Sequence, residues 1–236
     1  MGYLSKEHIV LMPGLDGTGK SFEPLLPLIA ADAGVTVVRY PADRSLSFEQ
    51  TVACAAGQIP RESSPVIIAE SFSGPVAIRM IASGRVSPKA LVLCATFVRS
   101  PHPVLWRIVR FLRLPLAIRP DMPRSFFKFV IGPDSLIETL KPLWKKVHAE
   151  VPARIMDSRL ALINTIDVTG DLQKLTLPCL FLQAANDRII PSSRLEDITC
   201  RIPHMQVKSI DAPHFILQAA PDDCLQAVET FIKQIY

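Results

Sequence analysis

A serine at the junction between an apolar run and a helix-like segment has the setting of a nucleophile. Ser71 follows the run Val66-Ile-Ile-Ala-Glu70 and precedes Phe72-Ser73-Gly74-Pro75. A serine in a strained strand-to-helix turn exposes its hydroxyl, and the turn requires small residues two positions before and after it. Ala69 and Ser73 are small, although the usual motif has glycines there. The segment alone also fits an ordinary turn in which Ser71 or Ser73 caps the helix.

An acid and a base follow this serine in chain order. Asp187 comes shortly after an apolar run at residues 179–183, and His214 follows the next run at 205–210. Each alone fits an ordinary polar loop residue. Together with Ser71 they form a set in which the histidine takes the serine proton while the carboxylate orients the imidazole. We therefore predict a catalytic triad.

The same chemistry needs donors for the oxyanion that forms when a serine attacks a carbonyl. The backbone N–H of Phe72, one past the nucleophile, is one predicted donor, and that of Leu15 in a glycine-rich loop is the other. The remaining histidines lack the setting of a base and are interpreted as surface or packing residues: His8, His102, His148 and His204.

The glycine-rich loop also supports a second interpretation. Residues 14–21 read Gly-Leu-Asp-Gly-Thr-Gly-Lys-Ser, which satisfies the phosphate-binding pattern G-x-x-x-x-G-K-[ST]. Such a loop passes directly into a helix, yet Pro24 and Pro27 follow, and proline in a helix interior removes a backbone donor. A nucleotide hydrolase also needs a Mg²⁺-binding acid after a second strand, where only Glu70 is available. Nucleotide binding stays open as an alternative.

These residues are positioned by short apolar runs that alternate with longer helix-like stretches. The alternation is typical of an α/β fold with a mostly parallel twisted sheet covered by helices on both faces. Strands are predicted at residues 8–12, 35–40, 66–69, 90–95, 179–183 and 205–210, and helices at 22–31, 48–58, 74–83, 192–200 and 221–235. Each predicted triad residue directly follows or lies shortly after one of these strands.

The alternation stops at about residues 100–169, where the sequence becomes aromatic, basic and interrupted by prolines. We interpret this part as a helical cap inserted into a single domain that spans residues 1–236. Apolar side chains at helical spacing can pack the insertion onto the main domain and line a pocket under it. The aromatic candidates are Trp106, Phe111, Phe126, Phe127, Phe129 and Trp144.

Charge and composition limit the classes of partner. The net charge of +4 is uneven, because residues 99–154 carry eleven Lys/Arg against four Asp/Glu, a local +7, and the rest of the chain carries −3. The interpretation of the basic part that needs no binding partner is a solvated helical surface. No apolar stretch reaches the length of a membrane span, and the five cysteines have neither disulfide-framework nor zinc-site spacing. We expect a cytoplasmic protein without metal, cofactor, nucleic-acid partner or transmembrane segment.

The chain resembles the α/β-hydrolase superfamily over nearly its full length. The resemblance rests on Pro13-Gly14-Leu15-Asp16-Gly17, Glu70-Ser71-Phe72-Ser73-Gly74, Asn186-Asp187 and Pro213-His214. Its size and helical cap look like those of compact esterases, including the ones that cleave pimeloyl-carrier-protein methyl esters. The resemblance implies an apolar acyl pocket under the cap. It also implies that an acidic acyl carrier protein or a substrate carboxylate docks on basic cap residues, with Arg107, Arg110, Arg113 and Arg124 as candidates.

Three functions are therefore compatible with the sequence. The first is hydrolysis of a carboxylic ester or thioester by the triad through an acyl-enzyme, a carboxylesterase or thioesterase activity on a small-molecule acyl substrate. The second is nucleotide binding at residues 14–21. The third is a hydrolase-fold scaffold without catalysis, because a fold does not guarantee a function. The complete set of triad candidates favours the first.

Overall fold

A six-stranded parallel sheet forms the centre of the molecule. The computed structural model describes residues 2–102 and 123–235. The strand order is β2-β1-β3-β4-β5-β6, and every neighbouring pair is parallel. The strands are β1 (His8–Met12), β2 (Gly34–Val37), β3 (Val66–Glu70), β4 (Ala90–Cys94), β5 (Cys179–Ala184) and β6 (Gln206–Ile210).

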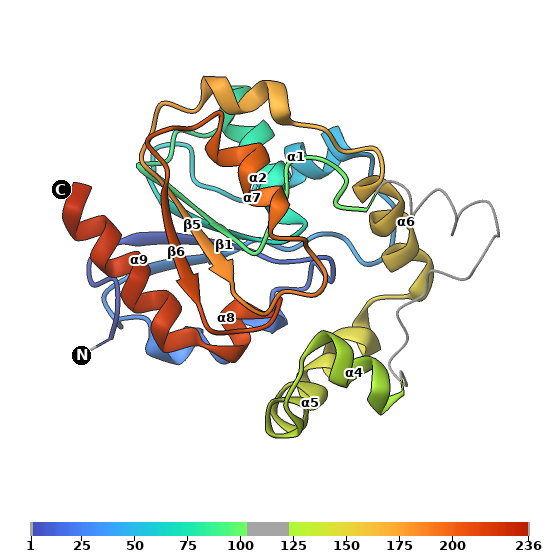
Figure 1. Cartoon of the computed structure of the whole chain (residues 1–236). Coiled ribbons are helices and arrows are strands. Elements are labelled where there is room, and N and C mark those ends of the chain that lie inside the picture. Colours follow the sequence, from blue (N-terminus) through green and yellow to red (C-terminus); the bar gives the residue numbers. More distant parts are fainter. Residues whose placement is uncertain (1, 103–122, 236) are drawn as a thin grey trace.

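Alternate side chains of the central strands are buried in two separate cores, one on each face of the sheet. Val10, Ile67 and Leu91 are fully buried in the first core, against helices α1 (Phe48–Ala56), α2 (Ser73–Ala82) and α7 (Ser193–Thr199). Their chain neighbours Ile9, Ile68 and Val92 are buried in the second core, against the C-terminal helix α9 (Pro221–Ile235). Figure 1 shows the helices on both sides of the sheet. A sheet buried on both faces explains why its strands are continuous apolar runs.

The predicted α/β sheet with helices on both faces is confirmed, including all six strands. The helix predicted at residues 22–31 is wrong, because two short 3₁₀ turns, η1 (Lys20–Phe22) and η2 (Leu26–Leu28), take its place. Pro24 and Pro27 each lack the N–H that a continuous helix would need. Two short elements were not predicted, α8 (Ile216–Ala219) and the 3₁₀ helix η3 (Thr169–Lys174).

Three helices lie between β4 and β5, at the end of the sheet where the strands finish (Figure 1). We refer to α4 (Arg124–Val130), α5 (Asp134–Glu150) and α6 (Ala153–Ile163) as the inserted helices. Phe127 packs edge-on against Trp144, with ring centroids 5.4 Å apart, and joins α4 to α5. Two ion pairs join α5 to the segment around η1. Lys20 of η1 pairs with Glu150 of α5, and the carboxylate of Glu23, just after η1, lies 2.7 Å from the ammonium of Lys146 of α5. The predicted aromatic residues Trp106 and Phe111 lie outside the described residues.

The segment that carries the inserted helices begins and ends at the same place beside the sheet. Arg99 and Asp167 form an isolated antiparallel bridge. Beside it, the N–H of Val168 donates to the carbonyl of Val98 at 2.9 Å. The two ends of the segment are therefore hydrogen-bonded to each other.

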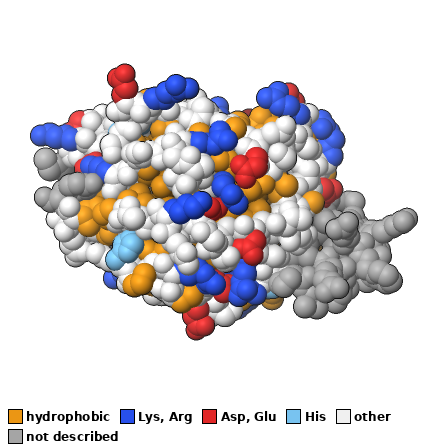
Figure 2. All heavy atoms as spheres, turned by 90° about the horizontal axis from the view of Figure 1, so that it is seen from above, with side chains coloured by type: hydrophobic (Ala, Val, Ile, Leu, Met, Phe, Trp, Pro, Cys, Tyr) orange, Lys and Arg blue, Asp and Glu red, His pale blue; other side chains and the backbone are white. Residues whose placement is uncertain are grey.

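Charges of both signs are mixed on the face shown in Figure 2, where Lys and Arg side chains stand among Asp and Glu. Within residues 2–102 and 123–235, no helix is long and apolar enough to cross a membrane. The same described ranges contain no cluster of three or more His, Cys, Asp or Glu side chains suited to a metal ion. All five cysteines are free thiols, and Cys94, Cys179 and Cys224 are buried.

Candidate active site

Ser71 occupies a strained turn directly after β3. Its φ of 48° lies in the left-handed region, which a residue with a side chain seldom adopts. The turn is held by hydrogen bonds from the Ser71 N–H to the carbonyl of Cys94 at 2.9 Å and from the Thr96 hydroxyl to the carbonyl of Ser71. A Cβ on Gly74 would come within 2.0 Å of Thr96 Oγ1, so this close contact requires glycine. Strand, turn and helix thus form the elbow that the sequence predicts.

Ser73 ties this elbow to the glycine-rich loop. Its hydroxyl donates to the carbonyl of Pro13, so the Tyr40 hydroxyl at 2.6 Å must donate to Ser73. Burial raises the pKa of Tyr40, which keeps the hydroxyl protonated and able to donate. Helix α2 has no side-chain cap, so the alternative in which Ser71 or Ser73 serves as its cap is wrong.

The structure brings the three predicted triad residues into one hydrogen-bonded chain. His214 Nε2 lies 3.0 Å from Ser71 Oγ, and His214 Nδ1 lies 2.8 Å from Asp187 Oδ2. Because a carboxylate only accepts, Nδ1 carries the proton and Nε2 is left to accept from the serine hydroxyl. The second Asp187 oxygen accepts from the N–H groups of Ile189 and Ile190, each at 2.8 Å. Backbone donors therefore fix the carboxylate that orients the imidazole.

The two predicted oxyanion donors belong to residues near Ser71. A Cβ built on Gly14 would be 3.8 Å from the Ser71 Cβ, so the chain just before Leu15 passes close to the nucleophile. Phe72 follows Ser71 and is fully buried against Tyr40. Neither the Leu15 N–H nor the Phe72 N–H has a hydrogen-bond partner among the described residues. The absence of such a partner in the described chain is compatible with the predicted role of these two N–H groups.

Arg159 of α6 holds the glycine-rich loop in place and was not predicted from sequence. This residue is 6% exposed, and its guanidinium donates to the carbonyls of Leu15 (3.0 Å), Asp16, Tyr40 (3.4 Å) and Pro41 (2.9 Å). A planar fork of donors suits several carbonyl acceptors at once. The sequence signal for this role was an arginine beside Leu160 on an otherwise apolar helix face. The signal was not enough, because the carbonyls that accept from Arg159 are 118 or more positions away in the chain.

The loop geometry does not form a phosphate cradle. Asp16 Oδ1 accepts from the N–H (2.8 Å) and hydroxyl of Thr18, so a carboxylate occupies donors that a phosphate would need. Lys20 forms an ion pair with Glu150. The three-residue turn η1 follows the loop in place of a long helix. A phosphate-binding loop presents several free N–H groups, a free lysine and the start of a helix, whereas here the N–H groups of Gly17, Thr18 and Lys20 are already bonded within the loop and Lys20 is paired.

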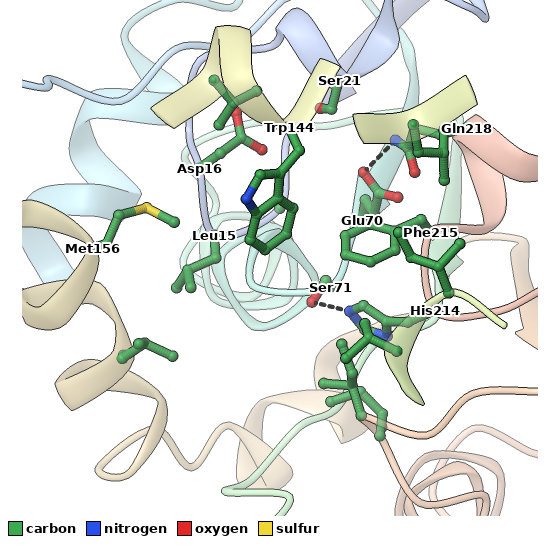
Figure 3. Close-up of a pocket in the computed structure, with 18 of the residues that line it drawn as sticks. Leu15, Asp16, Ser21, Glu70, Ser71, Trp144, Met156, His214, Phe215 and Gln218 are labelled. Atoms are coloured by element: carbon green, nitrogen blue, oxygen red, sulfur yellow. Dashed lines mark hydrogen bonds between the residues drawn. The ribbon is translucent and has the colours of Figure 1, made fainter. Parts of the chain in front are cut away.

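A pocket of about 200 Å³ opens above Ser71 and His214. Trp144, Met156, Leu15 and Phe215 project into it in Figure 3. Other apolar walls come from the inserted helices: Phe126, Val130, Ile131, Leu140, Leu143, Val147, Leu160 and Ile163. His102 and His148, interpreted from sequence as surface or packing residues, also line the pocket. An apolar cavity with a few polar groups is the usual form of a small-molecule site.

Glu70 and Gln218 form a buried polar pair on the pocket wall (Figure 3). Gln218 Nε2 donates to Glu70 Oε2 at 3.1 Å, and the two residues are 6% and 4% exposed. Burial raises the pKa of Glu70 from 4.5 to about 7, against the opposing effect of the Gln218 hydrogen bond. The sequence did not predict this pair, because Gln218 belongs to the unpredicted helix α8.

The predicted docking arginines are only partly within the described chain. Arg107, Arg110 and Arg113 lie outside the described residues. Arg124 pairs with both Asp134 and Glu138 at 3.2 Å, so its charge is already neutralised locally. Exposed pairs of this kind contribute little to stability.

The sequence matches no family model and no curated protein. Solved structures match along nearly the whole chain. MenH from S. aureus has a TM-score of 0.81 at 14% identity, with 100% of this chain and 97% of that chain covered. A putative non-heme bromoperoxidase, BpoC from Mycobacterium tuberculosis H37Rv, has a TM-score of 0.79 at 14% identity, with 98% and 93% covered. The chain has the α/β-hydrolase fold.

A third structure shares the α/β-hydrolase fold at similar distance. A lipase-esterase related protein from Clostridium acetobutylicum ATCC 824 has a TM-score of 0.72 at 14% identity, with 99% of this chain and 96% of that chain covered. Likeness at this identity establishes the α/β-hydrolase fold and leaves the reaction to be argued from the site.

Proposed function

We propose that this protein is a serine hydrolase that cleaves carboxylic esters or thioesters through an acyl-enzyme. The observation that carries the proposal is the hydrogen-bonded chain from Ser71 through His214 to Asp187, at the base of an apolar pocket. Each member has a local reason for its position: a strained elbow for the serine, a carboxylate partner for the histidine, and two backbone donors for the aspartate. Such triads are recognised by geometry and roles.

In the proposed reaction, the Ser71 hydroxyl attacks the substrate carbonyl while His214 Nε2 accepts its proton. Asp187 stabilises the resulting imidazolium, and the N–H groups of Leu15 and Phe72 bind the oxyanion. Collapse of the tetrahedral intermediate breaks the bond to the alcohol or thiol, and His214 returns the proton to that leaving group. A water molecule, activated by the same imidazole, then hydrolyses the acyl-enzyme and regenerates Ser71.

The inserted helices supply most of the apolar pocket wall, and we propose that they act as a cap that sets acyl specificity. Apolar surface favours an apolar acyl group, because its burial removes that group from water.

Five free thiols, three of them buried, support a second proposal, that the protein resides in a reducing compartment such as the cytoplasm.

The experiment that tests this function compares nitrophenyl acyl esters of increasing chain length. The wild type is expected to hydrolyse them, and Ser71→Ala is expected to lose at least about a thousandfold in kcat. Ser64→Ala, an exposed serine far from the pocket, is the matched control and keeps the wild-type rate. Equal rates for wild type and Ser71→Ala would overturn the serine mechanism.

The nucleotide-binding alternative has its own variant. Lys20→Ala is expected to leave ester hydrolysis within about twofold, because Lys20 pairs with Glu150 at the surface and does not touch the triad. Calorimetry with ATP and Mg²⁺ is expected to show no binding to the wild type. Binding that disappears in Lys20→Ala would instead support the phosphate-loop interpretation.

A carrier-bound substrate is the finer proposal for the basic part of the chain. Residues 99–154 carry a net +7, which favours an acidic partner such as an acyl carrier protein. Reversing Arg107 and Arg110 together to glutamate is expected to raise KM for a carrier-bound acyl ester and to leave small nitrophenyl esters unaffected. An unchanged KM for the carrier-bound substrate would exclude this docking surface.

A further inference from the structure

Four buried polar atoms on the wall of the largely apolar pocket have no hydrogen-bond partner among the described residues, three of them on Glu70, Gln218 and Ser21 and the fourth being His148 Nε2. Glu70 Oε1, Gln218 Oε1 and Ser21 Oγ are buried and have no hydrogen-bond partner among the described residues. All three residues line the pocket above Ser71 (Figure 3). Turn η1, which carries Ser21, packs against α8, which carries Gln218. Buried polar atoms in native proteins are nearly always paired, so several unpaired ones on one pocket wall indicate a place for a polar group of a ligand or for an ordered water that such a group can replace.

The hydrogen bond between Glu70 and Gln218 leaves one oxygen of each side chain without a partner among the described residues. The Gln218 amide donates to Glu70 Oε2 at 3.1 Å, which fixes the amide so that its own oxygen faces away from that bond. Both remaining oxygens can therefore bind a ligand group: the Gln218 amide oxygen accepts, and Glu70 Oε1 accepts when the carboxyl group is ionised or donates when it is protonated. An unpaired buried acceptor destabilises a protein, and a ligand that supplies the donor removes this cost.

We propose that the pocket recognises a hydroxyl group on the substrate, held by Glu70, Gln218 and Ser21. A hydroxyl donates one hydrogen bond to an acceptor oxygen of Glu70 or Gln218, and it can accept another from Ser21. A substrate carboxylate has no donor and would meet the Glu70 carboxyl group. An ammonium could donate to these oxygens, but it would lose its hydration in an apolar pocket.

The raised pKa of Glu70, about 7, agrees with a neutral partner. A carboxyl group that is protonated near neutral pH can donate to a hydroxyl oxygen, and the ionised form can accept from the hydroxyl proton. A hydroxyl therefore pairs with Glu70 in either protonation state, whereas a carboxylate can pair only with the protonated form and an ammonium is favoured only by the ionised form.

This inference rests on the proposed function, because it names the substrate class of the same site. The expected substrate is an ester whose acyl chain or alcohol part carries a hydroxyl within reach of the Glu70–Gln218 pair. Sites built to hydrogen-bond a hydroxyl discriminate strongly against an analogue that lacks it, since the buried groups stay unpaired.

The test compares kcat/KM for matched ester pairs. One arm uses nitrophenyl hexanoate against its hydroxylated derivatives along the chain, and a second uses propyl hexanoate against the hexanoate monoester of propanediol. At least one hydroxylated substrate is expected to exceed its partner about tenfold, which corresponds to about 1.4 kcal/mol. The arm in which this occurs shows which side of the ester bears the hydroxyl.

Variants separate recognition from a merely structural role of the pair. Gln218→Leu and Ser21→Ala are expected to reduce the preference to less than about threefold. Gln226→Leu, an exposed glutamine on α9, is the matched control and keeps the preference. A structural role would slow both members of each pair equally, so an unchanged ratio in Gln218→Leu would overturn the inference. A ratio near one for every pair in active wild-type protein would also overturn it.

Two further measurements keep the two proposals distinguishable. Covalent labelling by a fluorophosphonate reports the Ser71 nucleophile without any acyl pocket, and its absence in folded wild-type protein would overturn the proposed function. The inference then still has a binding test on Ser71→Ala. Methyl hydroxyhexanoates are expected to bind about tenfold more tightly than methyl hexanoate by calorimetry, and equal affinities would overturn it.

Discussion

A methyl group at Gly74 tests how the nucleophile elbow is held. The Cβ of Gly74→Ala would lie 2.0 Å from Thr96 Oγ1 and 2.7 Å from both Thr96 Cβ and Cγ2, all closer than atoms can approach. Because Thr96 also donates to the Ser71 carbonyl, relief of this clash must move either helix α2 or the support of the nucleophile.

The magnitude follows from two opposing effects. Overpacking in a close-packed interior costs about 1–3 kcal/mol. Replacement of glycine by alanine within a helix returns about 1 kcal/mol or less, and less still in the first turn where Gly74 lies. The free energy of unfolding is therefore expected to fall by about 1–2 kcal/mol. A displacement of the nucleophile by about 1 Å costs up to about a hundredfold in rate, so kcat should fall more than stability suggests.

Urea unfolding and nitrophenyl ester hydrolysis together measure both effects. Gly170→Ala is the matched control, because its Cβ would meet nothing within 4 Å and its backbone does not require glycine. That control is expected to keep wild-type stability and rate. A Gly74→Ala protein whose stability and kcat both equal those of wild type would show that the elbow does not depend on this contact.

Three other perturbations have defined outcomes. Asp187→Asn is expected to lower kcat by about ten-thousandfold with KM little changed, because the amide supports the wrong histidine tautomer; equal kcat would refute the role of Asp187. Burial raises the pKa of Glu70 from 4.5 to about 7, so folding favours the protonated form. The free energy of unfolding should therefore fall by up to about 3 kcal/mol as the pH rises from 4.5 to 7. Glu70→Gln should flatten this fall in urea unfolding at several pH values, and an unchanged slope would contradict it. Arg159→Lys is expected to lower kcat about tenfold by releasing the Leu15 loop, and crystallography of the variant would show whether that loop moves.

The sheet could be predicted from sequence because its strands are buried on both faces. Each strand is then a continuous apolar run of strand length between polar segments, and six such runs are visible. Residues 22–31 have apolar spacing that fits a helix, but Pro24 and Pro27 each remove a backbone donor, and the chain forms the short turns η1 and η2 there. The strand predicted at 35–40 ends at Val37, where the chain turns so that the Tyr40 N–H can donate to Gly17.

Some residues of the candidate site can be predicted from the sequence and others cannot. Ser71, Asp187 and His214 were identifiable because each stands just beyond an apolar run, where local sequence defines the position. Arg159 and Gln218 were not, because their partners are set by tertiary packing: Gln218 lies 148 positions from Glu70. No local pattern encodes which carbonyl a distant arginine will meet or which carboxylate a distant amide will meet.

The bridge between Arg99 and Asp167 makes the intervening segment exchangeable during evolution. Once its two ends are fixed side by side, chain length between them changes the cost of loop closure only slowly, by about 0.6 kcal/mol for each doubling. Insertions, deletions or a grafted segment from another protein can therefore alter the substrate pocket without shifting a strand of the sheet. A change in this segment would then alter the pocket wall while Ser71, Asp187 and His214 keep their positions.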